Sequence, residues 1–593
     1  MLGRGDHVLS LNLPEDKVLN PKKKPVTFKR RWNQLSKRQR SVIYMFGFIV
    51  VLTLFYAFSL DSKGAVISVD SVWKTREKVT LESFKSSLRE SQESGNKEQI
   101  AEPPKKVFEV PHEGQVANNR ADNEQVAKPP KNTIIFPEPS TPRQKAIVKA
   151  FRHSWKGYRQ FAWGHDNLKP ISEGYHDWFG LGLSIVDSLD TMYIMGLMEE
   201  YNEARDWVEK HLNFDINRDV NLFEVTIRVL GGLLSIYHFT RDEMYLKKST
   251  DLADRLLPGF ESESGIPYSD VNLFTRKAHA PRWSPDSSTS EVTTIQLEFR
   301  YLSWLTDNPK YENVVSKVSQ LVHKLEKTDG LVPIFINANT GQFRAYSTIT
   351  LGARGDSYYE YLLKQWLQTE KALDYLKDDY IQSISGMEKH LVRKTVPNGF
   401  LFLGELLGGS KDFKPKMDHL SCFMPGTLAL GVHNGLPNSH LKLAEELMTT
   451  CYQTYAQQPT FLAPEITYFN IQGENSNDMY VKSNDAHNLL RPEFLESLFY
   501  MYQLTGNTTY QDWGWQIFQG FENYTKVANG YTSIGNVKNT ANVRPKDMME
   551  SWFLSETLKY LYLLFGDDPK VLDLDKYVIN SEAHPFPIGR ANA

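Results

Sequence analysis

Three acidic side chains stand out because each lies in, or at the start of, an otherwise apolar run. They are Glu224 in "NLFEVTIRVLGGLL", Asp356 in "ARGDSYYEYLL" and Glu493 in "LRPEFLESLFY". A carboxylate that leaves water needs a partner or a function, because the loss of hydration costs several kcal/mol. For Glu224, the simplest interpretation is a local ion pair with Arg228, four residues later on the same helix face. The alternative is a catalytic acid that faces a pocket.

An arginine stands two positions before each of the other two acids, at Arg354 and Arg491. If Asp356 and Glu493 open helices, the helix N-terminus favours their ionised form, which suits a general base or a ligand for water or a cation. Glu224 lies deeper among apolar residues, where desolvation favours a protonated carboxyl group and hence a proton donor. An acid and a base with room for a water molecule between them form the arrangement of an inverting glycosidase.

The elements that must position these acids are helices, since apolar residues recur at helical spacing from Thr141 onward and strand patterns are sparse. Similar joints separate the helical runs, at Gly196, Thr240, Thr306, Thr369, Gly435, Thr505 and Gly566. We expect seven helical hairpins, arranged as a linear solenoid or as a closed toroid. The absence of recognisable capping repeats favours closure. If the hairpins repeat in parallel, the helices before the joints start at one end of the ring. The three acids then converge there.

Composition excludes several function classes. A net charge of −3 and a pI near 6.6 give no indication of nucleic-acid binding. Nucleotide-binding loops, zinc-type His/Cys spacing, a Gly-x-Ser-x-Gly turn and an EF-hand pattern are absent from the sequence. Calcium prefers oxygen ligands and could bind among Glu493, Glu550, Glu556 and Glu582. His419, beside Asp418, could face the same end of the ring, although a lone histidine is usually structural.

The N-terminal part differs from the rest. Residues 41–60 are 20 residues without a charge, long enough to cross a bilayer, and they follow a basic segment at 1–40. We expect a cytosolic tail (1–40), a transmembrane signal anchor (41–60) and a polar, Pro-rich flexible stem (61–138). The lumenal domain then spans 139–593. A buried core helix is the alternative interpretation of 41–60.

A lumenal location also bears on the two cysteines and on glycosylation. Cys422 and Cys451 are the only cysteines, and an oxidising compartment favours a disulfide between them over two buried thiols. Asn507 and Asn523 begin Asn-x-Thr sequons, so both are candidate glycosylation sites.

Six ordered blocks of this sequence resemble glycoside hydrolase family 47, the class I α-1,2-mannosidases. They are "NLFEVTIRVLGGLLS", "LGARGDSYYEYLLKQW", "DHLSCFMPGTLALG", "LRPEFLESLFYMY", "ESWFLSETLKYLYLLF" and the tail "NSEAHPFP". The resemblance covers about Thr141 to Pro587. It implies an all-α (αα)7 barrel plugged by a C-terminal hairpin, bound Ca²⁺, and inverting hydrolysis of α-1,2-linked mannose on high-mannose N-glycans in the endoplasmic reticulum or Golgi.

The resemblance also implies residue roles. Glu224 would be the general acid, acting through water, and Glu493 the base; Asp356 is the third catalytic carboxylate, and either Glu224 or Asp356 could protonate the leaving group. Ser581 stands where the family has a calcium-binding threonine, and Cys422 and Cys451 match the family disulfide. Matches to sugar-contacting or water-holding positions are Arg228, Glu291, Arg354, Asp418, His419, Arg491, Trp552, Glu556 and Glu582, with Trp552 in place of a usual phenylalanine.

Two other functions remain open from the sequence. One is a lectin that binds mannose-rich glycans without hydrolysis, against which the intact acids Glu224, Asp356 and Glu493 argue. The other is a Golgi-type enzyme with broader trimming, against which Arg354 argues, because it resembles the arginine of the reticulum enzymes that remove one middle-branch mannose. Protein partners are not indicated.

Overall fold

The computed structural model describes residues 133–592, apart from 283, 409–411 and 474–475. The predicted tail, the signal anchor and the stem up to residue 132 lie outside the described residues, so these assignments stay predictions. Among the described residues, one helical stretch, Leu222–Thr240, is long and apolar enough to cross a membrane, but it is wholly buried in the protein core.

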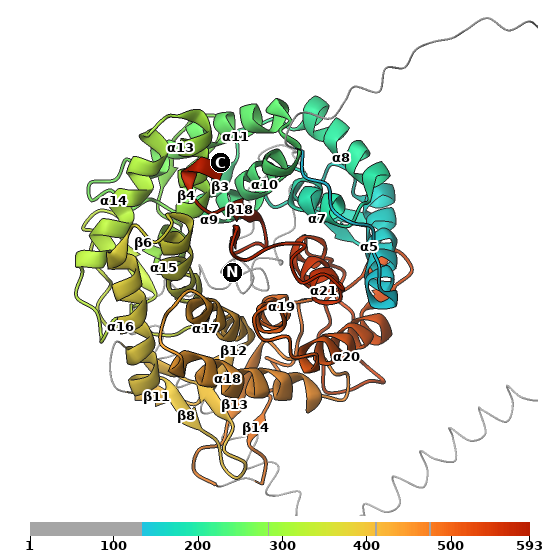
Figure 1. Cartoon of the computed structure of the whole chain (residues 1–593), viewed down its shortest axis with the longest axis vertical. Coiled ribbons are helices and arrows are strands. Elements are labelled where there is room, and N and C mark those ends of the chain that lie inside the picture. The colour runs from blue at the N-terminus through green and yellow to red at the C-terminus, as the bar shows by residue number, and fades with distance from the viewer. Residues whose placement is uncertain (1–132, 283, 409–411, 474–475, 593) are drawn as a thin grey trace, which may run out of the picture. The chain divides into compact units, whose positions relative to one another are not determined.

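Helices in the described part form two concentric layers around one centre (Figure 1). Those of the inner layer are almost entirely buried, which explains their apolar sequences. The inner layer consists of α6 (Leu183–Asp187) with α7 (Leu189–Ile194); α9 (Leu222–Val225), a π-helical turn (Thr226–Leu230) and α10 (Gly231–Thr240); α12 (Thr289–Thr293) with α13 (Gln296–Thr306); α15 (Asp356–Gln368); a 3-10 turn (His419–Phe423) with α17 (Met424–His433); α19 (Glu493–Thr505); and a π-helical turn (Phe553–Thr557) with α21 (Leu558–Leu564).

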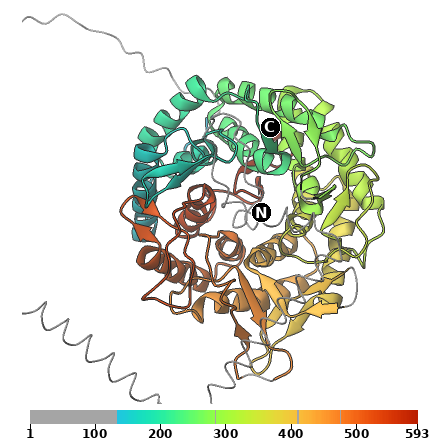
Figure 2. The ribbon, with the colours of Figure 1, turned by 180° about the vertical axis from the view of Figure 1, so that it is seen from behind.

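The outer layer surrounds the inner one, as the view from behind also shows (Figure 2). Its helices are amphipathic, with one buried and one exposed face. It consists of α5 (Pro142–Phe161), α8 (Met198–His211), α11 (Glu243–Leu256), α14 (Lys310–Lys324), α16 (Asp374–His390), α18 (Ser439–Ala456) and α20 (Thr509–Tyr524). Each of the seven predicted joints lies at the last residue of an inner helix or within two residues after it. The predicted all-α barrel of helical hairpins is therefore confirmed for the described residues.

The ring differs from seven consecutive hairpins in how it closes. No outer helix follows the joint at Gly566; instead α5, from the start of the domain, packs against α21. Thr141 Oγ1 donates to the carbonyl of Phe565 (2.8 Å), and Gln144 Nε2 donates to the carbonyl of Tyr562 (3.2 Å). The N-terminal end of the domain thus completes the last pair, and the ring has no open edge.

The neighbouring inner helices α13 and α15 run in parallel, as the contacts between their segments show. The hydrogen-bonded partners advance in the same direction along both segments. Thr294, two residues before α13, pairs with Ser357 (2.8 Å), Glu298 pairs with Tyr361 (2.8 Å) and Arg300 pairs with Gln365 (3.2 Å). The N-terminal ends of these two helices therefore lie at the same end of the ring, as parallel repetition of the hairpins predicted.

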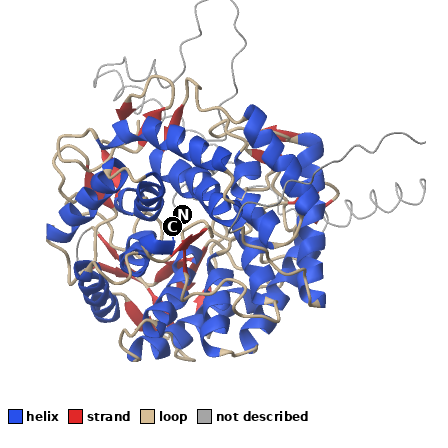
Figure 3. Ribbon diagram, turned by 45° about the horizontal axis from the view of Figure 1, so that its top comes forward, coloured by secondary structure: helices blue, strands red, loops and turns tan. Residues whose placement is uncertain are grey.

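Short antiparallel strands occupy the connections between helices, and they are the main departure from a purely helical expectation (Figure 3). Three of them, β3, β6 and β12, run directly into the inner-layer segments that begin at Leu222, Thr289 and His419, so strand pairing fixes where these helices start. The pairs and triplets are β1 (Asn167–Lys169) with β2 (Gly174–His176); β3 (Asp219–Asn221), β4 (Asp270–Asn272) and β5 (Ala278–His279); β6 (Asp286–Ser288) with β7 (Phe335–Asn337); β8 (Val392–Lys394) with β9 (Leu401–Leu403); β10 (Glu405–Leu407) with β11 (Asp412–Lys414); β12 (Lys416–Asp418), β13 (Ile466–Phe469) and β14 (Met479–Tyr480); and β15 (Lys526–Val527) with β16 (Gly530–Tyr531).

A C-terminal hairpin enters the centre of the ring, as predicted. It consists of β17 (Tyr577–Ile579) and β18 (Pro585–Pro587), and its turn is anchored to several inner helices. Asn580 Nδ2 donates to the carbonyl of Ile227 (2.9 Å) and to Glu298 Oε1 (2.8 Å), while Lys559 Nζ donates to the carbonyl of Ala583 (2.7 Å). The hairpin therefore joins helices from opposite sides of the ring.

Cys422 and Cys451 form the predicted disulfide, with Cα atoms 6.0 Å apart and a sequence separation of 29. The bond ties the turn before α17 to α18. Replacing both cysteines with serine should lower the free energy of unfolding by roughly 3–4 kcal/mol, because the unfolded chain regains the entropy of an open loop. Denaturant unfolding followed by tryptophan fluorescence measures this change, and an unaltered free energy would contradict the loop-closure argument.

Candidate active site

The three predicted acids lie at the N-terminal ends of inner helices. Glu224 is in α9, Asp356 is the first residue of α15 and Glu493 is the first residue of α19, and all three are buried. The contacts described below bring these N-terminal ends together on one side of the ring. Chains of polar and aromatic contacts connect Glu224 to Glu493 and to the loop before Asp356, as follows.

Glu224 is held by Arg228 and by the cap of its own helix. Asn221 Oδ1 accepts from the Glu224 backbone N–H (2.9 Å), and Arg228 Nε donates to Glu224 Oε2 (2.8 Å). The local ion pair that the sequence suggested therefore forms. It is not isolated, because Arg228 Nη1 also donates to Glu582 Oε2 of the hairpin (2.8 Å). Arg228 thus links the first acid to the plug.

Trp552 connects the Glu224 group to the Glu493 group. The guanidinium carbons of Arg228 and Arg491 lie 5.4 Å and 5.8 Å from the centre of its ring, both within cation–π range. Its indole N–H donates to the carbonyl of Leu489 (2.9 Å), which fixes the ring. The residues between Glu224 and Glu493 are therefore in continuous contact.

Glu493 is bracketed by a histidine and an arginine. His419 Nδ1 lies 2.9 Å from Glu493 Oε2, and Arg491 Nη1 lies 3.8 Å from Glu493 Oε1. The other histidine nitrogen, Nε2, lies 2.7 Å from the hydroxyl of Tyr455, and Arg491 is itself held by Glu465 at 2.6 Å. These contacts fix the orientation of the carboxylate, which a general base requires.

A second set of contacts joins the Glu224 segment to the loop before Asp356. Glu291 accepts from Asn221 Nδ2 (3.3 Å) and Ser288 Oγ (3.0 Å), and Arg354 Nη1 donates to the same Ser288 hydroxyl (2.8 Å). Burial raises the pKa of Glu291 to about 7. On the far side of this loop, Asp418 Oδ2 accepts from the backbone N–H of Ala353 (3.2 Å).

Asp356 behaves differently from the expectation for a helix-opening acid. Its Oδ1 accepts from the Ser357 N–H (2.8 Å), but burial raises its pKa to about 6. The loss of hydration outweighs the stabilisation of charge by the helix N-terminus. Asp356 therefore carries a proton more readily than the sequence indicated, and it is a candidate proton donor as much as a base.

Sequence reasoning missed a buried charge cluster on α15 and α19. Lys364 Nζ donates to Glu360 Oε1 (2.5 Å) and to Glu496 Oε1 (3.3 Å), and burial raises the pKa of Glu496 to about 8. The sequence could have indicated this cluster, because Glu360 and Lys364 are four residues apart within an apolar helix, as Glu224 and Arg228 are. The cluster packs behind the acids that open the same two helices.

Ser581, the predicted metal ligand, lies in the turn between β17 and β18. Its side-chain oxygen is buried and, among the described residues, has no hydrogen-bond partner; the same is true of Glu298 Oε2 and Glu360 Oε2. Glu298 and the backbone N–H of Ser581 both contact the hydroxyl of Tyr361, at 2.8 Å and 3.4 Å. Oxygen atoms without partners are what Ca²⁺ prefers, so these residues fit the ion.

The other calcium site considered from the sequence, a group of four glutamates, is not supported. Within the described ranges, no group of three or more His, Cys, Asp or Glu side chains could hold a metal ion, so Glu493, Glu550, Glu556 and Glu582 do not form a direct ligand group. Glu582 is instead bound by Arg228, and Glu556 is buried in the π-helical turn before α21.

At the surface, the sequon residues Asn507 and Asn523 are both exposed.

Comparison with known proteins identifies the fold. The family model of glycosyl hydrolase family 47 matches residues 150–588. The chain belongs to this family. Among solved structures, an α-1,2-mannosidase from Trichoderma reesei superposes with a TM-score of 0.71 at 29% identity, covering 76% of this chain and all of that one.

Curated relatives of the family are more similar in sequence. The human endoplasmic reticulum mannosyl-oligosaccharide 1,2-alpha-mannosidase is 56% identical over 449 residues, and the match covers 75% of this chain and 64% of the human protein. The chain thus spans just under two thirds of that relative's length. An Arabidopsis thaliana mannosyl-oligosaccharide 1,2-alpha-mannosidase, MNS3, is 47% identical over 532 residues, covering 81% of this chain and 83% of that protein.

Proposed function

We propose that this family 47 protein is a calcium-dependent, inverting exo-glycosidase that removes terminal α-1,2-linked mannose from high-mannose N-glycans. The observation that carries the proposal is a buried group of contacts that joins all three acid-bearing segments. Glu224 is linked through Arg228, Trp552 and Arg491 to Glu493. The segment of Glu224 is also linked through Glu291 and Ser288 to the loop before Asp356. An ionised base and a protonated acid within one buried group are the parts that this reaction needs. The names of the similar proteins give the substrate class.

The proposed mechanism assigns the base and the proton donor among the three acids. Glu493, oriented by His419 and Arg491, accepts a proton from a water that attacks the anomeric carbon from the face opposite the leaving group. A carboxylic acid donates a proton to the glycosidic oxygen as the C–O bond breaks, and the configuration inverts. The pKa of Asp356, raised to about 6, supports it as this donor, whereas Glu224 forms an ion pair with Arg228.

The other polar residues would bind sugar or hold water. The residues that the family resemblance assigns to these roles are Arg228, Glu291, Arg354, Asp418, His419, Arg491, Trp552, Glu556 and Glu582. We further propose that the product is the eight-mannose glycan, because Arg354 resembles the arginine of the reticulum enzymes. Endoplasmic reticulum residence, with a lumenal catalytic domain and a single N-terminal anchor, is proposed from the names of the relatives and from the sequence.

One assay tests the proposal against its alternatives. The purified protein is incubated with a nine-mannose glycan, with and without a chelator, and the products are sized. Loss of one mannose that the chelator prevents supports the proposal. Absence of any product would indicate a lectin, and loss of three or four mannoses would indicate Golgi-type trimming.

Calcium would be held by Ser581, through its hydroxyl and carbonyl oxygens, with waters completing the shell. When bound, the ion would supply a fixed positive charge for sugar hydroxyls. Replacing Ser581 with alanine should weaken calcium binding by about 10- to 100-fold, as the loss of a metal-site contact typically does. Calorimetric titration of the metal-stripped protein measures this without relying on activity. Ser581→Thr is the matched control, since it keeps the hydroxyl, and equal affinities for all three proteins would remove Ser581 from the site.

A further inference from the structure

Lys416 lies between two carboxylates at the start of the strand that leads to His419. Its Nζ donates to Glu405 Oε1 of β10 (2.8 Å) and to Asp418 Oδ1 (2.9 Å). Lys416 and Asp418 point to the same side of β12, because they are two positions apart in a strand. The side chains of Lys416, Glu405 and Asp418 are only 22%, 8% and 13% exposed, so this group differs from the exposed ion pairs of the outer layer, which contribute little.

One of the two carboxylates, that of Asp418, contacts the loop before α15. Its Oδ2 accepts from the backbone N–H of Ala353 (3.2 Å). The same oxygen lies directly against Gly352, where an added Cβ atom would come within 2.5 Å of it. A larger residue at 352 would displace the carboxylate, so the loop and Asp418 fit each other closely.

The other carboxylate, that of Glu405, contacts the beginning of the same loop. Its Oε1 accepts from the Thr350 hydroxyl (3.2 Å), and the Thr350 oxygen accepts in turn from the Gly352 N–H (2.9 Å). The neighbours Leu406 and Ile349 exchange two backbone hydrogen bonds, of 2.9 and 3.0 Å. Lys416 therefore binds both of the carboxylates that hold residues 350–353.

Arg354 follows this segment directly, and its backbone is strained. Its φ of 74° lies in the left-handed region, which is uncommon for a residue with a side chain and persists only where the surrounding structure enforces it. The Arg354 guanidinium donates to the Ser288 hydroxyl (2.8 Å), and the Asp356 N–H donates to the carbonyl of Gly352 (3.0 Å). The conformation of residues 350–353 thus determines where the guanidinium lies and where α15 begins.

We propose that Lys416 is a positioning residue for Arg354. By binding Asp418 and Glu405 together, its ammonium group keeps residues 350–353 in the conformation that presents the Arg354 guanidinium to the glycan. The inference rests on the proposed function, in which Arg354 binds the substrate. It extends that function to a lysine that acts through another residue.

A double-mutant cycle between Lys416→Met and Arg354→Ala tests this proposal. The kcat/KM of the full chain is measured on a nine-mannose glycan. Each single substitution should lower it about 10- to 100-fold, as the loss of a hydrogen bond to a charged group does. The double variant should be at most about two-fold slower than Arg354→Ala, because a lysine that acts through Arg354 then has nothing left to position. Lys416→Arg keeps the positive charge and should retain most of the activity.

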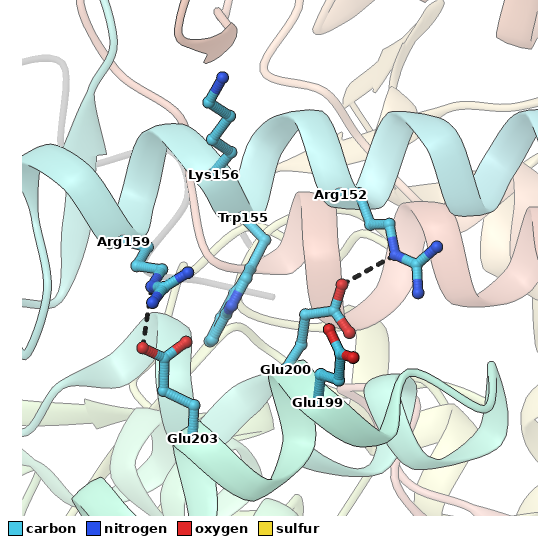
Figure 4. A pocket seen from close by; sticks show the side chains of 7 residues that line it. All are labelled: Arg152, Trp155, Lys156, Arg159, Glu199, Glu200 and Glu203. Carbon is cyan, nitrogen blue, oxygen red and sulfur yellow. Dashed lines mark hydrogen bonds and ion pairs between the residues drawn. The ribbon is translucent and has the colours of Figure 1, made fainter. Parts of the chain in front are cut away.

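Two further variants separate positioning from a loss of stability. Thr350→Val breaks the same path without leaving a charge unpaired, and its effect should also disappear when Arg354 is alanine. Arg152→Met is the matched control, because it removes a paired cation on the outer layer. Arg152 Nε donates to Glu200 Oε1 (2.8 Å) at the groove between α5 and α8 (Figure 4), and this variant should be as active as wild type.

Three results would overturn the proposal. They are normal activity of Lys416→Met or Arg354→Ala, losses that multiply in the double variant, and a loss in Lys416→Arg as large as in Lys416→Met. If Lys416→Met does not fold, the cycle of Thr350→Val with Arg354→Ala decides in the same way. Absence of hydrolysis by wild type would refute the proposed function and this inference with it, whereas wild-type hydrolysis together with any of the three results refutes the inference alone.

Discussion

Replacing Glu493 with glutamine is expected to lower turnover of a nine-mannose glycan by about 10²- to 10⁴-fold, the usual contribution of a general base. Glutamine has the same shape and can still contact His419, but its amide cannot accept the proton of the attacking water. Binding of the glycan should persist, because the arginines and Trp552 that surround the position remain. Turnover by product analysis and binding by calorimetry are the two measurements.

The control for this variant is Asp512→Asn, which replaces a carboxylate with an amide at an exposed ion pair with Arg143, 2.8 Å long, on the outer layer. Its turnover should match wild type. If Glu493→Gln also turns over normally, Glu493 is not the base. If it loses both turnover and binding with an unchanged unfolding temperature, Glu493 contributes to sugar binding rather than to proton transfer.

The ring could be predicted from the sequence because the residues that mark its joints act on their immediate neighbours in the chain. Joints such as Thr240 and Thr505 combine helix-ending and helix-capping residues, and these act within a few positions of the chain. The placement of Glu224, Asp356 and Glu493 at one end then followed from parallel repetition alone. The disulfide was predictable because Cys422 and Cys451 had no other partner.

Features that depend on contacts between distant segments were not predictable in the same way. The position of Trp552 between two arginines requires helices that are far apart in sequence, and so does the pairing of Lys364 with Glu496. The closing role of α5 was missed because nothing in its own sequence identifies α21 as its neighbour. The raised pKa of Asp356 was not anticipated, because burial, which outweighs the effect of the helix terminus, is a property of the folded protein.

The identity of the proton donor leads to the second large effect. Asp356→Asn should lower glycan turnover by about 10²- to 10⁴-fold, because an amide cannot protonate the leaving oxygen. The loss should be much smaller on α-D-mannosyl fluoride, since fluoride departs without protonation. Glu224→Gln should instead be impaired on both substrates, because it disturbs Arg228 and, through it, Glu582 and Trp552.

Steady-state rates of both variants on both substrates separate the two acids. Recovery of Asp356→Asn alone on the fluoride assigns the donor to Asp356. Recovery of Glu224→Gln alone reverses the assignment, and then the charge on Arg228 must be compensated by Glu582 while Glu224 carries a proton. The comparison of the two variants isolates proton donation, because both substitutions preserve the shape of the side chain. What each removes is the proton that its carboxyl group can supply.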